Sequence, residues 1–459
     1  MPNDTKPPTS PLPLDAYYDS THRGYLVADE DGNWMPIDTA SLKIRLRKLS
    51  FRTNKQEGEN ISPVDMLITR IQDERNVQYV GCLAGFTRGI HYINGAKILV
   101  THSPKCVEPK QGDWSLIRQV IEGQLLDDHR QADRFHGWVQ NSESSLRACM
   151  RTGIPTYGQA LILAGPKSCG KSLLQALLTH VFGGRSAGPY RYMSGITAFN
   201  RELFGSEHQK IEDEQPFKDQ KSRVRFGDAI KNVASTTEGS CHGKNREAIK
   251  LTPFWRLTLS VNDEPEHLEI LPPFNDSLMD KIILLHCKHA PMPMPAGTNE
   301  EKTVFWNALV AQLPAYVWWL QNEFVIAPEM RNARYGTAPF FHPYIVGLLD
   351  DISPKVRLLS VCQHVLFMDG LLEWEGTGEE LQRVLSESTY KQAARSIIPS
   401  DGPGKLLAQL AVMPNPLVFD TRTAVKRTWK IVAAKNADPT SDDAMTPVPE
   451  VYPKMEPLL

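Results

Sequence analysis

The spacing of apolar and polar residues changes character several times along this chain of 459 residues. Residues 160–164 are continuously apolar, a glycine-containing segment follows, and apolar residues then recur at three- and four-residue intervals up to Phe182. A continuous apolar run is typical of a strand buried on both faces, and the longer spacing is typical of a helix. The pattern therefore predicts a strand, a loop and a helix, with Gly183-Gly184 ending the helix.

Short strands and helices are predicted on either side of this centre. Residues 1–13, rich in Pro, Ser and Thr, and the aperiodic tail at 436–459 have the composition of segments outside a packed core. We expect strands at 24–27, 33–37, within 91–100, at 190–193 and at 254–262, helices at 41–49, 197–204, 221–231 and 301–324, and two short helices between 114 and 150.

The region after residue 335 has a different pattern. It predicts short helices at 354–367, 377–386 and 389–397, a helix near Leu406, and two strands at 417–420 and 424–432. Three helices and a hairpin describe a winged helix, whose hairpin would be cationic through Lys426, Arg427 and Lys430. A packing domain without a ligand has the same pattern, so DNA binding by this region is one of two interpretations.

Composition narrows the class of protein further. The formal net charge is −2, so contact with nucleic acid has to come from a local basic surface. Seven cysteines without a CxxC pair favour a reducing compartment and no structural zinc site. The N-terminal residues lack the apolar run of a signal peptide, and the most apolar helix is interrupted by polar residues and Pro314. We expect a cytoplasmic protein without a membrane segment.

The loop after residue 164 has the sequence of a phosphate-binding P-loop. Gly165 and Gly170 let backbone N–H groups turn inward, where they and the helix N-terminus surround a polyphosphate. Lys171 would reach the β- and γ-phosphates, and the Ser172 hydroxyl would bind Mg²⁺. The sequence thus predicts binding of ATP and Mg²⁺ by Gly165, Pro166, Lys167, Ser168, Cys169, Gly170, Lys171 and Ser172.

An acidic cluster at residues 207–214 supplies candidates for the carboxylates that ATP hydrolysis requires. One carboxylate has to bind Mg²⁺, and a second has to orient or deprotonate the attacking water. We assign these roles to Glu212 and Asp213, with Glu214 as the substitute. The preceding His-Gln-Lys is more polar than a buried parallel strand usually is, so a solvated acidic loop is the alternative.

A basic segment follows. His242, Lys244 and Arg246 lie between two segments that can pair as strands, at 234–237 and 248–251, which predicts a hairpin with cations at its tip. Such a tip suits the phosphodiester backbone of a nucleic acid, which it can hold irrespective of base sequence. A basic turn that is only solvated is the alternative.

The order of these features resembles a superfamily 3 helicase of the AAA+ class. A P-loop, an acidic pair and a basic hairpin are followed by Asn262 at the end of a predicted strand, where an amide can hold the attacking water. More closely, residues 241–244, 253–257, 262–265 and 271–273 with 280–282 look like the poxvirus-type primase-helicase relatives carried by bacteriophages, prophages and mobile elements. The resemblance covers about residues 115–335.

The resemblance implies an α/β fold with an AAA+ P-loop NTPase core. It also implies a ring, usually a hexamer, that hydrolyses ATP between subunits and pulls one DNA strand through its pore. By position, Lys171 and Ser172 match Walker A, Glu212 and Asp213 match Walker B, Asn262 matches sensor 1, and His242 with Lys244 matches the pore hairpin.

The family commonly places an arginine finger shortly after sensor 1. Lys281 is the nearest match, although a lysine lacks the guanidinium fork. Arg223, Arg225 and Arg256 are the alternatives for the cation that would act on a neighbouring subunit.

The domain organisation follows from these assignments. Single-stranded or forked DNA, further copies of the chain and a separate primase or replication protein are the expected partners. The expected parts are an N-terminal α+β accessory domain at 1–112, a helical collar at 113–155, the AAA+ domain at 156–335, the winged-helix-like domain at 336–435 and a tail at 436–459.

Three other functions are compatible with parts of the pattern. A DNA-binding initiator or loader would use nucleotide only as an assembly switch, and an AAA+ NTPase of a defence system would share the motor without the replication role. A small-molecule kinase is disfavoured because the chain shows no lid segment.

Overall fold

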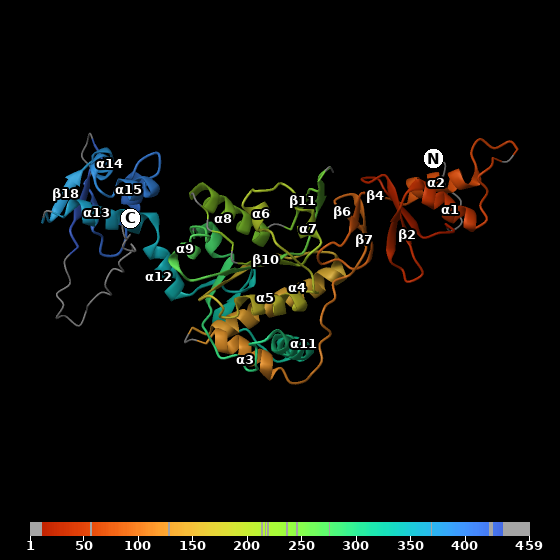
Figure 1. Cartoon of the computed structure of the whole chain (residues 1–459), viewed down its shortest axis with the longest axis horizontal. Helices are drawn as coiled ribbons and strands as arrows, with labels where there is room; N and C mark the ends of the chain where they lie inside the picture. The colour runs from red at the N-terminus through yellow and green to blue at the C-terminus, as the bar shows by residue number, and fades with distance from the viewer. Residues whose placement is uncertain are drawn as a thin grey trace, which may run out of the picture. The chain divides into compact units, whose positions relative to one another are not determined.

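The computed structural model describes residues 12–55, 57–126, 129–212, 214–215, 217, 220–235, 237–244, 247–274, 276–368, 370–421 and 426–434. The described residues form two compact units, which divide between Val346 and Gly347 (Figure 1). Each unit has a hydrophobic core of its own.

A six-stranded sheet forms the centre of the first unit, and every neighbouring pair of its strands is parallel. The predicted strand at 160–164 lies inside this sheet with all of its residues buried. The strands are, in spatial order, β17 (Phe340–Phe341), β14 (Ile282–His286), β8 (Ala160–Ala164), β13 (Arg256–Val261), β10 (His208–Glu212) and β9 (Ser186–Ala187).

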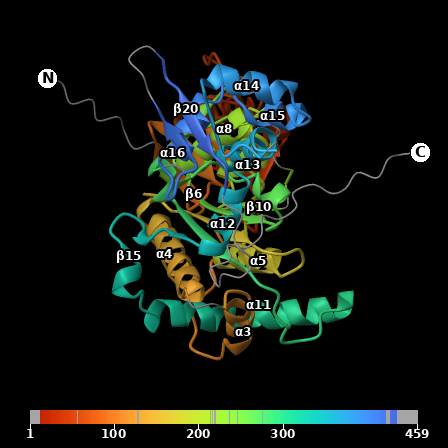
Figure 2. The ribbon, with the colours of Figure 1, turned by 90° about the vertical axis from the view of Figure 1, so that its left-hand side faces the viewer.

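Helices cover both faces of this sheet. The long ones are α3 (Ser115–Gln124), α4 (Gln131–Thr152), α5 (Lys171–Val181), α8 (Gln220–Ser235) and α11 (Asn299–Asn322). Helix α8 lies on one face, and α4, α5 and α11 lie on the other (Figures 1 and 2). The first unit is therefore a mixed α/β structure consistent with a P-loop-like core. Helix α4 has 22 residues, so the prediction of two short helices is wrong for the second one.

Two predictions for the segment after α5 need correction. Residues 190–193 form a short helix, α6 (Tyr190–Met193), instead of a strand, because the buried Tyr190 and Met193 are three residues apart and share one helical face. The helix predicted at 197–204 is limited to α7 (Arg201–Phe204).

The residues before α3 form two small sheets. One sheet has the order β3 (Trp34–Ile37), β2 (Gly24–Ala28), β1 (Ala16–Asp19) and β4 (Asn76–Val77), and α1 (Thr39–Lys48) and α2 (Pro63–Glu74) share its small core. The second sheet has the order β5 (Tyr79–Gly81), β7 (Ala96–Val100) and β6 (Gly89–Ile93). Its buried residues Tyr79, Ile98 and Val100 belong to the main core of the first unit. The strand pairs predicted around residues 24–37 and 91–100 are confirmed.

The remaining elements of the first unit are short. They are β11 (Gly239–Cys241), β12 (Ile249–Leu251), α9 (Pro265–Leu268), α10 (Asp276–Met279), η1 (Pro328–Met330), β15 (Arg331–Asn332) and β16 (Gly336–Thr337). Helix α12 (Pro343–Asp351) contains the boundary between the units.

After the end of α12, the described residues of the second unit form four helices and a three-stranded antiparallel sheet. The predicted helices are present. The strand predicted at 417–420 corresponds to β19, and the one predicted at 424–432 is limited to β20, which begins at Trp429; residues 422–425 lie outside the described residues. Strand β18 was not predicted because its sequence, Glu-Trp-Glu-Gly, is mostly polar. The elements are α13 (Pro354–Leu366), β18 (Glu373–Gly376), α14 (Gly378–Glu387), α15 (Lys391–Ile397), α16 (Gly404–Ala411), β19 (Val418–Asp420) and β20 (Trp429–Val432).

Within the part of the chain that the structure describes, every helix is too short or too polar to cross a bilayer.

Candidate functional site

The segment between β8 and α5 is a tight loop. Gly170, at the N-terminus of α5, has a φ of 102°, and Ser168 has a φ of 63°, which is uncommon for a residue other than glycine. Gly165 is needed for a different reason, since a Cβ atom there would overlap the carbonyl oxygen of Cys287, directly after β14. The two glycines of the predicted P-loop therefore serve separately for backbone conformation and for close approach.

Lys171 is the first residue of α5, and only 7% of its surface is exposed. Its Nζ donates to the carbonyl oxygens of Gly165 at 2.6 Å and Pro166 at 2.8 Å, and to Oδ1 of Asn262 at 3.1 Å. Since β13 lies beside β8 and ends at Val261, Asn262 lies at the same carboxyl edge of the sheet as the loop. The structure brings together the loop lysine and the strand-terminal asparagine that the sequence singled out.

Glu212 is at the carboxyl end of β10, opposite Ser260 of β13. Its side chain is 36% exposed, and its Oε2 lies 2.9 Å from Nζ of Lys210. Ser172 is exposed in the first turn of α5, and Asp213 lies outside the described residues. The hydroxyl of Ser172 and the carboxylate of Glu212 are oxygen donors, and Mg²⁺ is commonly bound by one or two protein oxygens together with substrate phosphates. These two residues fit that chemistry.

The polar sequence of β10 does not prevent a strand, so the alternative of a solvated loop is wrong for residues 208–212. The buried ring of His208 has both nitrogens 2.7 Å from a threonine hydroxyl, Thr179 on one side and Thr258 on the other. Burial lowers the pKa of His208 to about 3, so the ring is neutral at ordinary pH. Polar side chains with hydrogen-bond partners are tolerated inside a protein, and this explains a buried strand of unusual composition.

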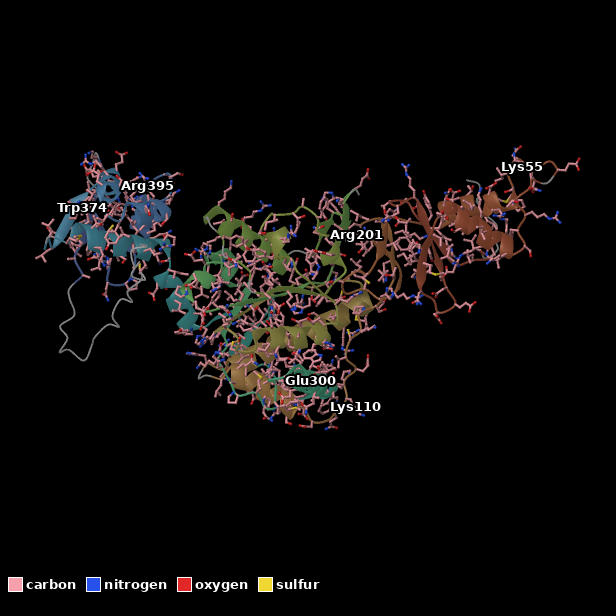
Figure 3. All side chains as sticks on the ribbon, viewed as in Figure 1. Lys55, Lys110, Arg201, Glu300, Trp374 and Arg395 are labelled. Carbon is pink, nitrogen blue, oxygen red and sulfur yellow. The ribbon has the colours of Figure 1, made fainter. Side chains whose placement is uncertain are left out.

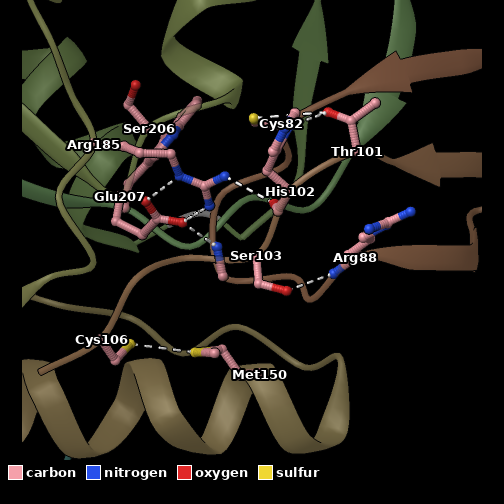
Figure 4. A network of polar contacts seen from close by, with 12 residues as sticks. Cys82, Arg88, Thr101, His102, Ser103, Cys106, Met150, Arg185, Ser206 and Glu207 are labelled. Atoms are coloured by element: carbon pink, nitrogen blue, oxygen red, sulfur yellow. Dashed lines mark hydrogen bonds and ion pairs between the residues drawn. The ribbon is translucent and has the colours of Figure 1, made fainter. Parts of the chain in front are cut away.

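Glu207 belongs to the acidic cluster but has a structural environment. It is completely buried, and it accepts hydrogen bonds from Nε of Arg185 at 2.9 Å and from the backbone N–H of Gly85 at 2.9 Å. A second nitrogen of Arg185 also contacts the carboxylate, and Arg185 donates to the carbonyl of His102 at 3.1 Å (Figure 4). Glu207 thus connects residues 85–102 to the start of β10.

Sequence patterns gave no indication of several residues beside the loop. Gln124, the last residue of α3, is fully buried next to Gly170, and its side-chain amide has no hydrogen-bond partner within the described ranges. The thiol of Cys287 donates to Cys169, and this hydrogen bond lowers the pKa of Cys169 and raises the pKa of Cys287. These contacts join residues distant in sequence, and the strand order brings them together.

The predicted basic hairpin is present with a different start. Strands β11 and β12 pair antiparallel, but α8 runs to Ser235, so the strand predicted at 234–237 begins instead at Gly239. His242 and Lys244 follow β11 at the tip, where Lys244 is exposed. Arg246 lies outside the residues that the structure describes.

Asn200 holds this hairpin in place. Its backbone N–H donates to the carbonyl of His242 at 3.0 Å, its Nδ2 donates to the carbonyl of Ser240 at 2.9 Å, and its Oδ1 accepts from the N–H of His242 at 2.7 Å. The ring of Phe199 lies 5.3 Å from the ring of His242. The hairpin is therefore fixed to the segment that leads into α7.

The candidates for a cation that acts on a neighbouring subunit differ in environment. Arg256 is fully buried, burial lowers its pKa to about 9, and its guanidinium donates to Ser142 Oγ at 3.2 Å, so it is excluded from this role. Lys281 is 6% exposed, donates to the carbonyl of Ser277 at 2.8 Å and contacts Asp280. The remaining two candidates are Arg223, which donates to the carbonyl of Leu271, and Arg225, which is exposed.

Solved structures share the fold. The NrS-1 C-terminal region in its apo form aligns with 92% of this chain over 97% of its own length, with a TM-score of 0.52 and 12% sequence identity. A second apo structure of that region gives a TM-score of 0.51 at 13% identity, with coverage of 92% and 96%. SCCmec type IV Cch, an active helicase, aligns with 92% of this chain and 93% of its own, with a TM-score of 0.41 at 12% identity. At such identities the NrS-1 comparisons establish the fold alone.

No protein-family model matches the chain, and no curated protein sequence matches it.

Proposed function

We propose that this protein is an ATP-dependent helicase or translocase of superfamily 3 in the AAA+ class, acting on DNA. The observation that carries the proposal is the hydrogen bond from Lys171 to Asn262 at the carboxyl edge of the central sheet. Ligands of open α/β sheets bind at that edge. A loop lysine and a strand-terminal amide that converge there are placed to grip the γ-phosphate and to hold the attacking water.

Different residues of the site would have different roles in ATP hydrolysis. Backbone N–H groups of the loop and Nζ of Lys171 hold the phosphates, and Asn262 with Asp213 orients the water for in-line attack. Ser172 and Glu212 would hold Mg²⁺, which neutralises charge on the phosphates when bound. For this, Glu212 has to exchange its contact with Lys210. A cation from the next subunit completes the site. Lys281 is the positional match, and to act there it has to leave its contacts with Ser277 and Asp280.

The hairpin is the proposed contact with the translocated strand. The phosphodiester backbone would be held by His242, Lys244 and Arg246. The hydrogen bond between Asn200 and His242 supports a hairpin that moves as a rigid body with the rest of its subunit. A ring, most simply a hexamer, places one hairpin per subunit around a central strand. In this arrangement, ATP hydrolysis in one subunit would move the hairpin of that subunit and, with it, the bound strand.

The second unit is proposed to be a winged-helix-like domain. Its order of helix, strand, helices and hairpin supports this assignment. The hairpin cations are partly neutralised within the unit, since Arg427 lies 2.8 Å from Asp420 and Lys430 lies 2.6 Å from Glu373. We therefore assign it a supporting contact with DNA. The N-terminal accessory domain at 1–112 and the collar at 113–155 are kept as proposals. The boundary inferred after residue 335 is moved to Val346, because β17 belongs to the central sheet.

The proposed setting is the replication of a phage or mobile element, with a separate primase or replication protein as partner. A nucleotide-switched initiator or loader is the second candidate, because Lys281 is buried and bound within its own chain. A defence NTPase would share the same site.

Hydrolysis and strand separation test the proposal together. Wild type is expected to hydrolyse ATP and to unwind forked DNA, Lys171→Ala to lose both activities, and Lys244→Ala to keep hydrolysis and lose unwinding. If wild type assembles on DNA but hydrolyses little ATP, the nucleotide-switched initiator or loader is the better assignment. Hydrolysis by Lys171→Ala at the wild-type rate would contradict the assignment of the site.

A further inference from the structure

A groove of about 730 Å³ lies beside the hairpin tip and is lined by three segments of the first unit. One wall is β5, at the edge of the small sheet β5-β7-β6, the second is the segment from Gly188 to Gly205, and the third is the tip at residues 242–244. The volume is in the range of small-molecule sites. The groove is therefore large enough for one or two nucleotide units and too small for a duplex.

The walls are held together by specific contacts. Arg201, labelled in Figure 3, donates to the carbonyl of Val80 at 2.8 Å, and its guanidinium lies 4.6 Å from the ring centre of Tyr79. Asn200, the residue before it, binds the hairpin. The segment from Gly188 to Gly205 is thus bound to β5 through Arg201 and to the hairpin through Asn200. Because these contacts hold the three walls together, the groove is preformed.

The lining is cationic and aromatic. Arg191, Arg201 and Lys244 carry positive charge and Glu202 is the only carboxylate among the lining residues, which gives a formal net charge of +2 with His242 neutral. Arg191 and Lys244 are exposed, and Arg191 also interacts electrostatically with the carboxylate of Glu214, which is not among the residues that line the groove. Two large rings are also exposed in the groove, Tyr192 at 38% and Phe199 at 44%.

We propose that this groove binds one or two nucleotide units of single-stranded nucleic acid, with phosphates at Arg191 and Lys244 and a base stacked on Tyr192. Aromatic rings and cations in one groove are the combination that holds a single strand without reading its sequence. The inference rests on the proposed function and extends it, because α6 supplies new contacts and β5 of the N-terminal region becomes a wall of the strand's path.

Binding of fluorescent oligothymidylate to the full chain, measured by anisotropy over a series of salt concentrations, tests this. Arg191→Gln is expected to make the slope of log affinity against log salt less steep by about 0.7, the value for one phosphate contact on a single strand. Tyr192→Ala is expected to weaken binding about five-fold or more. An oligonucleotide with abasic positions should bind wild type less tightly, and this difference should shrink in Tyr192→Ala.

Matched controls are Lys302→Gln on α11 and Tyr92→Ala on β6, which remove an exposed cation and an exposed tyrosine away from the groove. Both are expected to bind as wild type does. If Arg191→Gln and Tyr192→Ala bind normally while Lys244→Gln is weakened, the groove proposal fails and the hairpin function stands. Equal losses in the controls would also overturn it. If wild type does not bind the oligonucleotide, the proposed function fails as well.

Discussion

Nζ of Lys171 lies 3.1 Å from Oδ1 of Asn262, a residue 91 positions further along the chain. The contact joins the loop after β8 to the end of the neighbouring strand β13. In the structure the lysine also donates to two loop carbonyls. A phosphate that enters the loop has to replace some of these partners, so the lysine and the asparagine are expected to respond to nucleotide together.

Replacing Asn262 tests this relationship. Asn262→Ala should lower kcat for ATP hydrolysis by about 100-fold, the cost of misplacing a reacting group, while nucleotide affinity changes little because the loop and Lys171 remain. Steady-state hydrolysis and binding of a fluorescent ATP analogue separate the two effects. Asn322→Ala, at an exposed position on α11, is the control. Hydrolysis by Asn262→Ala at the wild-type rate would remove this residue from the mechanism.

Gly165 should tolerate no side chain. Gly165→Ala is expected to lose nucleotide binding and to lower the free energy of unfolding by about 1–3 kcal/mol, because the new Cβ meets the backbone oxygen of Cys287. Gly347→Ala is the matched change, since no atom lies within 4 Å of a Cβ in that helical position. It should raise stability by about 0.5–1 kcal/mol. Chemical denaturation and nucleotide titration measure both, and normal nucleotide binding by Gly165→Ala would refute the loop geometry.

Glu207 should matter for stability and not for chemistry. Glu207→Ala leaves Arg185 without its buried partner, and the expected loss is about 3–5 kcal/mol in the free energy of unfolding. Glu59→Ala, at an exposed position, should change stability by less than about 0.5 kcal/mol. Denaturant unfolding provides the comparison. A similar small effect for both variants would show that the buried pair does not anchor residues 85–102.

Acid should destabilise the first unit through its buried histidines. Burial lowers the pKa of His208 and of His136 to about 3 from an ordinary value of 6.5. Above pH 6.5 both the folded and unfolded states are neutral at these rings. Between pH 6.5 and 3 only the unfolded state takes up the protons, so stability falls as pH falls, by up to about 1.4 kcal/mol per pH unit for each ring.

Unfolding free energies at pH 6, 5 and 4 check this dependence. His208→Gln should reduce the slope of unfolding free energy against pH by the contribution of one histidine ring. His102→Gln, at an exposed position, should leave this slope as in wild type. An unchanged slope in His208→Gln would mean that this ring is not held neutral in the folded protein.

Local patterns predicted the elements around the site. The apolar run before Gly165 and the helical spacing after Ser172 define β8 and α5 because both signals lie within about twenty residues. The strand before Asn262 and the hairpin around Lys244 were predicted for the same reason. The prediction of a strand at Tyr190–Met193 was wrong because the segment is too short. Four residues do not distinguish the two-residue period of a strand from the helical period of about 3.6 residues.

Contacts between distant segments could not be read from such patterns. The pairing of Cys169 with Cys287 depends on β14 lying beside β8, and the contact of Arg201 with Tyr79 depends on the small N-terminal sheet packing on the main core. The burial of Arg256 is likewise set by neighbours far along the chain, Ser142 and Thr156 among them. Strand order determines these relationships, and one sequence does not specify it.

Mixing subunits tests the ring motor most directly. Unwinding of forked DNA is measured while wild type is replaced in steps by Lys171→Ala, with total protein constant and subunits exchanged before DNA is added. If each subunit needs active neighbours in the ring, one mutant subunit impairs the whole ring. The unwinding activity, relative to wild type alone, should then fall well below the fraction of wild-type subunits in the mixture. Activity that falls in proportion to that fraction would show subunits working singly and would contradict the account.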